Sequence, residues 1–313
     1  MPLYSLRGII IKTRAFFLIF LLAFFWSFTF LLIRITVEDV NPVVLTFYRL
    51  TYALSFLCLV SIIRKAKLFS YGEFFGKLVI SSFFLNALPF TLCAIGEVHI
   101  DSSTTGIIEG TTPFFVLLFA WLFFNQKTIS WRQIRAFSMG FLGLLVIFYP
   151  FISKGAFKEV LGLGALLGMA ISFAFGFEFS EKYLKKVPPL EAVTIQLFCA
   201  LIMLLPFVLY LNNGSIPLIP LKAHTFLAIL GISSSLGWLT YFYAILATSA
   251  TNVSFATMIC PLITLIWGRV FLNEPLAWNK ILGASIVLGA LSILWNCHGH
   301  FYNTIKKNAT KRK

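Results

Sequence analysis

Long apolar runs separated by short polar segments follow one another along almost the whole chain. A run of about 20 apolar residues is long enough to cross the hydrocarbon core of a bilayer as an α-helix. Ten such runs can be delimited in the sequence: 15–36, 43–63, 77–97, 102–124, 133–152, 160–181, 191–211, 223–247, 251–272 and 279–297. They use nearly the full length, so the pattern predicts an all-α membrane protein with ten transmembrane helices and no separate soluble domain.

The second half of the chain repeats the pattern of the first half. Pro113 in the fourth run matches Pro261 in the ninth run, and each proline is followed by an apolar stretch, an asparagine and a tryptophan. Each unit holds five helices, and because five is odd, the second unit must enter the membrane from the opposite side. The predicted organisation is two inverted five-helix repeats with two tails: a cytoplasmic N-terminal tail at 1–14, the repeats at 15–152 and 160–297, and a basic cytoplasmic C-terminal tail at 298–313.

The charge distribution restricts the partners of the protein. The chain is 59% hydrophobic and 12% charged, whereas about 25% of the residues of a soluble domain are charged. The formal net charge of +14 would suit a nucleic-acid partner, but 18 of the 25 basic residues fall in segments that lie inside if the N-terminus is cytoplasmic. This excess follows the positive-inside rule. We therefore expect a multi-pass membrane protein with both termini in the cytoplasm, in contact with the lipid bilayer and not with nucleic acid.

Sequence motifs for enzymes and cofactors are missing. The chain contains no HExxH, GxSxG or P-loop pattern, so we expect neither an enzyme nor a cofactor. The five cysteines lie in or at the end of apolar runs without a CxxC pair. This placement is typical of small core side chains and argues against disulfides and metal ligands.

One carboxylate, Glu109, interrupts the apolar run at 102–124. It lies about seven residues from the outer end, which corresponds to a depth of about 10 Å. An acid in the hydrocarbon region marks a functional site by default. Gly106 and Gly110 form a small face that lets a neighbouring helix approach, and Pro113 removes one helical hydrogen bond and leaves a carbonyl free. The run therefore predicts a polar, slightly broken helix in the wall of a cavity.

Three roles for Glu109 stay open at this point. It could bind a cationic group of a substrate, it could take up and release a proton, or it could form a structural ion pair with Arg49, which lies at a similar depth in the second run. If that pair exists, a substrate has to compete with it. A second acid, Glu178, lies four residues before Lys182 near the inner end of the sixth run, and we expect a surface ion pair there.

Several local motifs resemble those of the EamA-type transporters of the drug/metabolite transporter superfamily. The residues that carry the resemblance are Trp26, Phe47-Tyr48-Arg49, Leu88-Pro89-Phe90, Gly96-Glu97-Val98-His99, Thr111-Thr112-Pro113, Ala250-Thr251, Pro261-Leu262 and Asn273-Glu274-Pro275. The resemblance covers roughly residues 15–297 and implies a ten-helix carrier of small organic metabolites, with a central cavity lined by helices 1, 3, 4, 6, 8 and 9. Many sequences of this type carry an uncharged residue where Glu109 stands.

The resemblance places several further side chains at the cavity. The candidates for substrate binding or coupling are Glu109, Arg49, Trp26, Thr112, Trp238, Tyr241 and Tyr243, and the candidates for helix breaks at the cavity are Pro113, Pro261 and Gly110. Aromatic faces can hold a cationic or planar ligand, although packing between helices or an interfacial belt also explains single aromatic residues.

The resulting functional hypothesis is a secondary active transporter of small polar metabolites in a bacterial cytoplasmic (inner) membrane, which works by alternating access. A buried carboxylate favours amino acids and amino-acid-derived or cationic metabolites, driven by protons or by exchange against a counter-substrate. An exchanger of S-adenosylmethionine or a nucleoside-like metabolite is the alternative within transport. A membrane protein that handles lipid or assists assembly without transport is the alternative of another class. Whether the chain is a monomer or a homodimer stays open.

Overall fold

The computed structural model describes residues 3–123, 131–153, 156–247, 249–254, 256–290 and 292–293, and these residues contain helices but no strand. Eight helical segments are long and apolar enough to cross a membrane, and a shorter apolar helix spans Ala256–Phe271. The first half contains α1 (Leu3–Thr36), α2 (Pro42–Ile63), η1 (Leu68–Phe74), α3 (Phe75–Ser82), η2 (Phe83–Ala87), α4 (Leu88–His99), α5 (Ser102–Glu109), α6 (Thr112–Leu122) and α7 (Trp131–Ser153). The second half contains α8 (Phe157–Tyr183), α9 (Pro189–Leu211), α10 (Leu221–Ala247), α11 (Ala250–Ser254), α12 (Ala256–Phe271) and a further helical stretch at 278–290.

Each of the ten predicted runs corresponds to helical structure, which confirms the expected all-α architecture. The third run is built from three consecutive elements, α3, η2 and α4, of which η2 is a π-helical turn. The fourth run is divided into α5 and α6. The predicted C-terminal tail at 298–313 lies outside the described residues.

Prolines begin the equivalent helices α2 and α9. Pro42 and Pro189 each lie in the first turn, where the missing N–H would have no partner within the helix in any case. At the start of α2, the Asn41 side chain also accepts a hydrogen bond of 3.0 Å from the backbone N–H of Val43. The same local rule thus starts the second helix of both halves.

The main helix contacts are related by the repeat: each of them has a counterpart between the equivalent helices when the two halves are exchanged. α1 packs against α10 and α12, and the equivalent helix α8 packs against α4 and α6. α2 packs against its own counterpart α9, and α5 packs against its counterpart α12. This pairing is what a two-fold axis between inverted repeats requires, so the contacts support the inverted five-helix arrangement.

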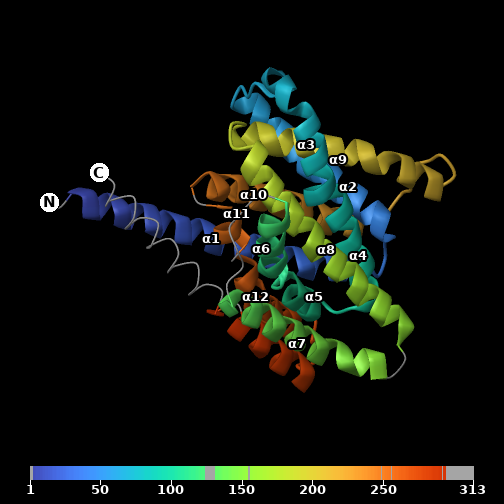
Figure 1. Ribbon diagram of the computed structural model, residues 1–313. Coiled ribbons are helices and arrows are strands. Elements are labelled where there is room, and N and C mark those ends of the chain that lie inside the picture. Colours follow the sequence, from blue (N-terminus) through green and yellow to red (C-terminus); the bar gives the residue numbers. More distant parts are fainter. Residues whose placement is uncertain are drawn as a thin grey trace.

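Successive spans run in opposite directions, which gives the bundle two ends. We name them after one residue each: the Asp101 end contains the connections at 100–101 and 272–277, and the Arg64 end contains those at 64–67 and 184–188. α5 and α6 occupy the middle of the bundle, whereas α7 and the helix at 278–290 lie along one edge (Figure 1). In the span of α5 and α6, 72% of the residues are buried, compared with 28% in α7. Glu109 thus belongs to the most enclosed of the eight long spans.

Candidate functional site

The first turn of α5 is held by two carboxylates. The first N–H groups of a helix have no partner within the helix, and in α5 each of the first three finds a side-chain acceptor. The N–H groups of Ser102 and Ser103 donate to the two carboxylate oxygens of Glu274, at 2.9 and 3.0 Å, and the hydroxyls of both serines donate to the same oxygens. The N–H of Thr104 donates to Asp101 at 2.9 Å. The start of α5 is therefore fixed by Glu274, which lies in the other half of the chain.

The helix breaks directly after Glu109. Gly110 ends α5, and Pro113 lies in the first turn of α6. Because proline has no N–H, Pro113 cannot donate to the carbonyl of Glu109 four residues earlier. The N–H of Phe114 donates to Thr111 at 3.0 Å, three residues earlier, instead of to Gly110. The break places the end of α5 and the Glu109 side chain inside the bundle.

Two glycines allow α5 to lie directly against α12. A Cβ atom on Gly106 would overlap the side chain of Thr264, and a Cβ atom on Gly110 would lie 2.9 Å from Cγ of Pro261. Neither position has room for a larger residue. The two counterpart helices of the inverted repeat therefore meet at the break of α5.

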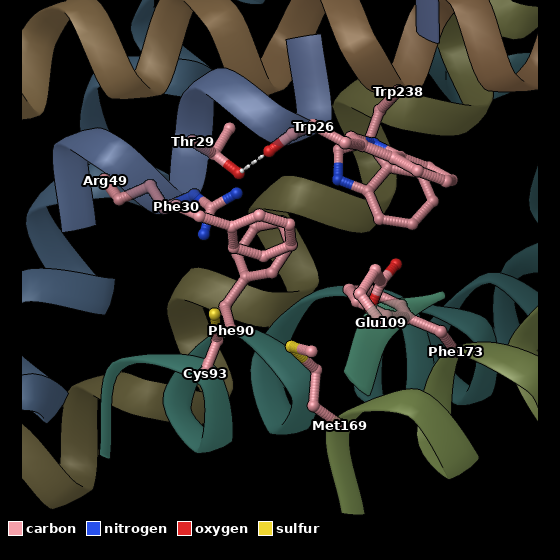
Figure 2. Close-up of a pocket in the computed structure, with 10 residues that line it drawn as sticks. All are labelled: Trp26, Thr29, Phe30, Arg49, Phe90, Cys93, Glu109, Met169, Phe173 and Trp238. Atoms are coloured by element: carbon pink, nitrogen blue, oxygen red, sulfur yellow. Dashed lines mark hydrogen bonds between the residues drawn. The ribbon is translucent and has the colours of Figure 1, made fainter. Parts of the chain in front are cut away.

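A small cavity lies beside Glu109, between the two halves (Figure 2). It is lined by Trp26, Thr29, Phe30, Arg49, Phe90, Cys93, Glu109, Met169, Phe173 and Trp238. These residues come from α1, α2, α4, α5, α8 and α10. The second transmembrane helix, α2, thus contributes to the wall in addition to the helices that the resemblance implied. The ninth helix, α12, packs against α5 and contributes no residue to this lining. The cavity volume is ≈ 20 Å³, which is about the space of one water molecule. A molecule much larger than water therefore does not fit into the cavity in this conformation.

The cavity wall carries one acid and one base that do not pair. Glu109 is 1% exposed, and its Oε2 atom has no hydrogen-bond partner among the described residues. Arg49 is 4% exposed; its Nε donates to the hydroxyl of Ser234 at 2.9 Å, and its Cζ lies 3.6 Å from the ring centre of Phe90. The ion pairs within the described part of the chain do not include Arg49 with Glu109. In Figure 2 the Phe90 ring lies between the two side chains.

Aromatic rings form much of the remaining wall. The ring centres of Trp26 and Trp238 are 5.8 Å apart, and the ring of Trp26 stacks on Phe173 at 6.3 Å and on Phe177 at 5.7 Å. These planar faces line the same cavity as both charged groups. Stacked rings of this kind can contact an apolar or planar part of a ligand and also attract a cation.

The structure brings four of the sequence-predicted residues together at the cavity, namely Arg49, Glu109, Trp26 and Trp238. Tyr241 is fully buried behind them, with its ring centre 5.2 Å from that of Trp238. Thr112 is fully buried, and its hydroxyl has no partner in the described residues.

Two further candidates lie elsewhere. Tyr243 is 49% exposed and does not line this cavity. Pro261 lies inside α12, which continues through it, so the break at the cavity comes from Gly110 and Pro113 alone.

The expectation of a surface position for Glu178 was wrong. Its side chain lies within α8 and is 3% exposed, and its Oε1 atom has no hydrogen-bond partner in the described residues. The acid near this end that forms an exposed pair is Glu181, at 2.8 Å from Lys185. Glu178 is buried because α8 is covered on several sides at this level, where Phe177 and Ser180, at other angles around the helix, are buried as well.

Comparison with known proteins identifies the family. The model of the EamA-like transporter family matches the chain twice, over residues 13–149 and 160–296. The chain belongs to this family. Its relatives include an uncharacterized transporter of Archaeoglobus fulgidus, 24% identical over 86% of this chain and 94% of that protein, and the uncharacterized transporter YoaV of Bacillus subtilis, 23% identical over 89% and 92%.

A third relative is an uncharacterized transporter in the trpA 3'region of Buchnera aphidicola subsp. Schlechtendalia chinensis, 28% identical over 88% of this chain and 93% of that protein. A solved crystal structure shares the fold with a TM-score of 0.66 at 14% identity, covering 90% of this chain and 96% of the other. Membership in the EamA-like family makes the protein a multi-pass membrane transporter and confirms the resemblance seen in the sequence. The family name does not specify a substrate.

Proposed function

We propose that this EamA-like transporter is a secondary carrier for a small zwitterionic metabolite, first of all an amino acid, in a bacterial cytoplasmic membrane. The observation that carries the proposal is the unpaired acid and base in one cavity, Glu109 and Arg49. An amino acid carries an ammonium and a carboxylate on the same carbon atom. Arg49 then binds the carboxylate, since a guanidinium matches its planar geometry, and Glu109 binds the ammonium.

The aromatic wall supports this assignment and allows a wider one. Trp26 and Trp238 provide planar surfaces in the same cavity as the charged groups, which suits an apolar amino-acid side chain. The same surfaces favour a second candidate, S-adenosylmethionine or a related nucleoside-like metabolite, whose planar base would stack on the rings. Both candidates carry an ammonium and a carboxylate, so the roles of Glu109 and Arg49 are the same.

The inverted repeats and the size of the cavity support a mechanism of alternating access. Transporters with this architecture rock one half against the other around a central site. A cavity of ≈ 20 Å³ cannot hold an amino acid, so this conformation is closed around the site. We place the Arg64 end and both termini in the cytoplasm because the basic residues are concentrated there. Energy comes from a proton gradient or from exchange, because the sequence has no nucleotide-binding motif.

Counterflow in proteoliposomes tests the proposal. The panel contains amino acids, the amines that lack their carboxylate, the acids that lack their amino group, and S-adenosylmethionine. We expect saturable uptake of a zwitterion and weak uptake of both single-charge analogues, because each leaves one buried charge without a partner. A flat response across the panel would reject these compounds as substrates and with them the proposed function.

Two variants assign the charged groups. Arg49→Gln should weaken uptake of carboxylate-bearing substrates and leave the amines unchanged, and Glu109→Gln should do the opposite. If Glu109 instead carries the coupled proton, Glu109→Gln will lose accumulation driven by a pH gradient and keep exchange. Equal losses for amines and acids in both variants would contradict the assignment of separate partners.

A further inference from the structure

A second cavity lies at the Arg64 end, between α2, α9 and α10. Its volume is ≈ 540 Å³, which is in the range of pockets that hold small organic molecules. It is lined by Val60, Arg64, Lys65, Ala66, Lys67, Tyr71, Leu190, Glu191, Leu239 and Tyr243. The set has no residue in common with the lining of the Glu109 cavity, so we treat it as a separate groove and name it the Arg64 groove.

The mouth of the Arg64 groove is positively charged. Arg64, Lys65 and Lys67 follow directly after the last residue of α2, and Glu191 is the one acid among the lining residues. Lys65 has a left-handed backbone conformation with φ of 52°, at a helix end where glycine is the usual residue. The chain thus places a lysine at the one position of this turn where a side chain costs most.

The walls of the groove are apolar and continue onto the outer surface of the bundle. On α2, the residues before the basic turn are strongly exposed, with Ile62 at 75% and Ile63 at 69%. On α10, Tyr243 is 49% and Leu246 is 42% exposed. Apolar side chains exposed on membrane-spanning helices face lipid tails. The groove therefore joins a charged mouth at the membrane surface to a wall in contact with the hydrocarbon.

We propose that the Arg64 groove binds an anionic glycerophospholipid. The phosphate group lies among Arg64, Lys65 and Lys67, and an acyl chain follows the wall formed by Val60, Leu239 and Tyr243. Basic pockets between helices at the membrane surface are suited to anionic lipid headgroups. A free anion would use only the charged mouth and would leave the apolar wall without a function. The proposal depends on the membrane location of the chain and not on its substrate.

Native mass spectrometry of the full chain in detergent tests this site. Phosphatidylglycerol and phosphatidylcholine with the same acyl chains are added in turn, and sn-glycerol 3-phosphate and inorganic phosphate serve as soluble probes. We expect phosphatidylglycerol to bind with an affinity at least about tenfold above that of phosphatidylcholine, as two or three nearby cations would produce. Equal binding of both lipids overturns the proposal. Binding of glycerol phosphate as tight as that of the lipid overturns it in favour of a site for free anions.

A matched pair of variants separates the groove from the general positive charge of the protein. Arg64→Gln/Lys67→Gln removes two charges from the groove, and Arg132→Gln/Arg135→Gln removes two charges from the start of α7, outside the groove lining. The first variant should lose the preference for phosphatidylglycerol, and the second should keep it. Equal loss in both variants would mean that lipid follows net charge alone, which contradicts a specific site.

A gain-of-binding variant makes the test independent of folding defects. Glu191 repels a phosphate in the groove, so Glu191→Gln should tighten phosphatidylglycerol binding several-fold and leave phosphatidylcholine unchanged. Unchanged or weaker binding of phosphatidylglycerol in this variant argues against a headgroup at this place.

Discussion

Glu274 and Glu109 lie at the two ends of α5, and their surroundings are opposite. Both are nearly withdrawn from solvent, at 7% and 1% exposure. Glu274 accepts hydrogen bonds at both oxygens from the first turn of α5, whereas Glu109 has an oxygen without a partner and faces a cavity. Burial alone therefore does not distinguish these two acids. Their hydrogen bonds do, because the satisfied carboxylate of Glu274 holds the two halves together, whereas the unsatisfied oxygen of Glu109 has capacity left for the ligand proposed above.

Glu109→Gln should produce the largest effect of the variants considered, and it tests the role proposed for the unsatisfied acid. Loss of the charge opposite a buried ammonium should raise the apparent KM for amine-bearing substrates by about 100-fold. The midpoint of thermal unfolding should stay the same or rise, since a neutral amide costs less to bury than an unpaired carboxylate. Counterflow and thermal unfolding of the same preparation measure both quantities. Reduced stability with unchanged uptake would make Glu109 a structural residue.

Glu274→Gln should give the reverse pattern. The amide directs its NH2 group at N–H donors that need an acceptor, so we expect unfolding to become easier by about 2 kcal/mol. The protein that stays folded should keep its preference for zwitterions over amines, because Glu274 does not line the cavity. Thermal unfolding and counterflow of the variant check this. A changed substrate preference with unchanged stability would remove the distinction between the two acids.

Of the two acids at the ends of α5, the sequence pointed to Glu109 but not to Glu274. Glu109 was identifiable because a single acid in an apolar run is unusual, and the spans and the inverted repeat were identifiable from run lengths and matching prolines. The role of Glu274 was not, because an acid next to Pro275 in a short connection has the pattern of a solvated loop. Its partners are 171 and 172 residues away in the chain, and only the packing of the two halves brings them together.

The second feature that could not be predicted from the sequence is the orientation of individual side chains on a helix. The polar and apolar residues of α10 do not separate into two faces, so its sequence does not show which face turns inward. Tyr241 and Tyr243 are two residues apart, and one is fully buried while the other is 49% exposed. Glu178 shows the same limit, since the nearby end of α8 suggested a surface position for a side chain that is buried.

Gly106→Ala tests the close contact between α5 and α12, which lies between the positions of Glu274 and Glu109 along α5. The added methyl group would overlap Thr264 on α12, and we expect a loss of about 1–2 kcal/mol in stability, typical of an overpacked site. Thr264→Ala in the same chain removes the two nearest atoms and should restore part of the loss, as measured by thermal unfolding. If the double variant is less stable than Gly106→Ala alone, the two side chains do not compete for this space.

Lys280→Gln should have the smallest effect on stability. It tests whether an ion pair at the Asp101 end holds α5 as strongly as the Glu274 carboxylate does. Lys280 lies 2.8 Å from Asp101, with 6% and 24% of the two side chains exposed, and loss of such a partly exposed pair costs up to about 1 kcal/mol. Asp101→Asn should cost more, because Asp101 also accepts hydrogen bonds from the N–H and the hydroxyl of Thr104 at the start of α5. Thermal unfolding of both variants at low and high salt separates these contributions, because only the ion pair is screened. If Lys280→Gln costs as much as Glu274→Gln, the ion pair and not the capping carboxylate is the main connection between α5 and the second half of the chain.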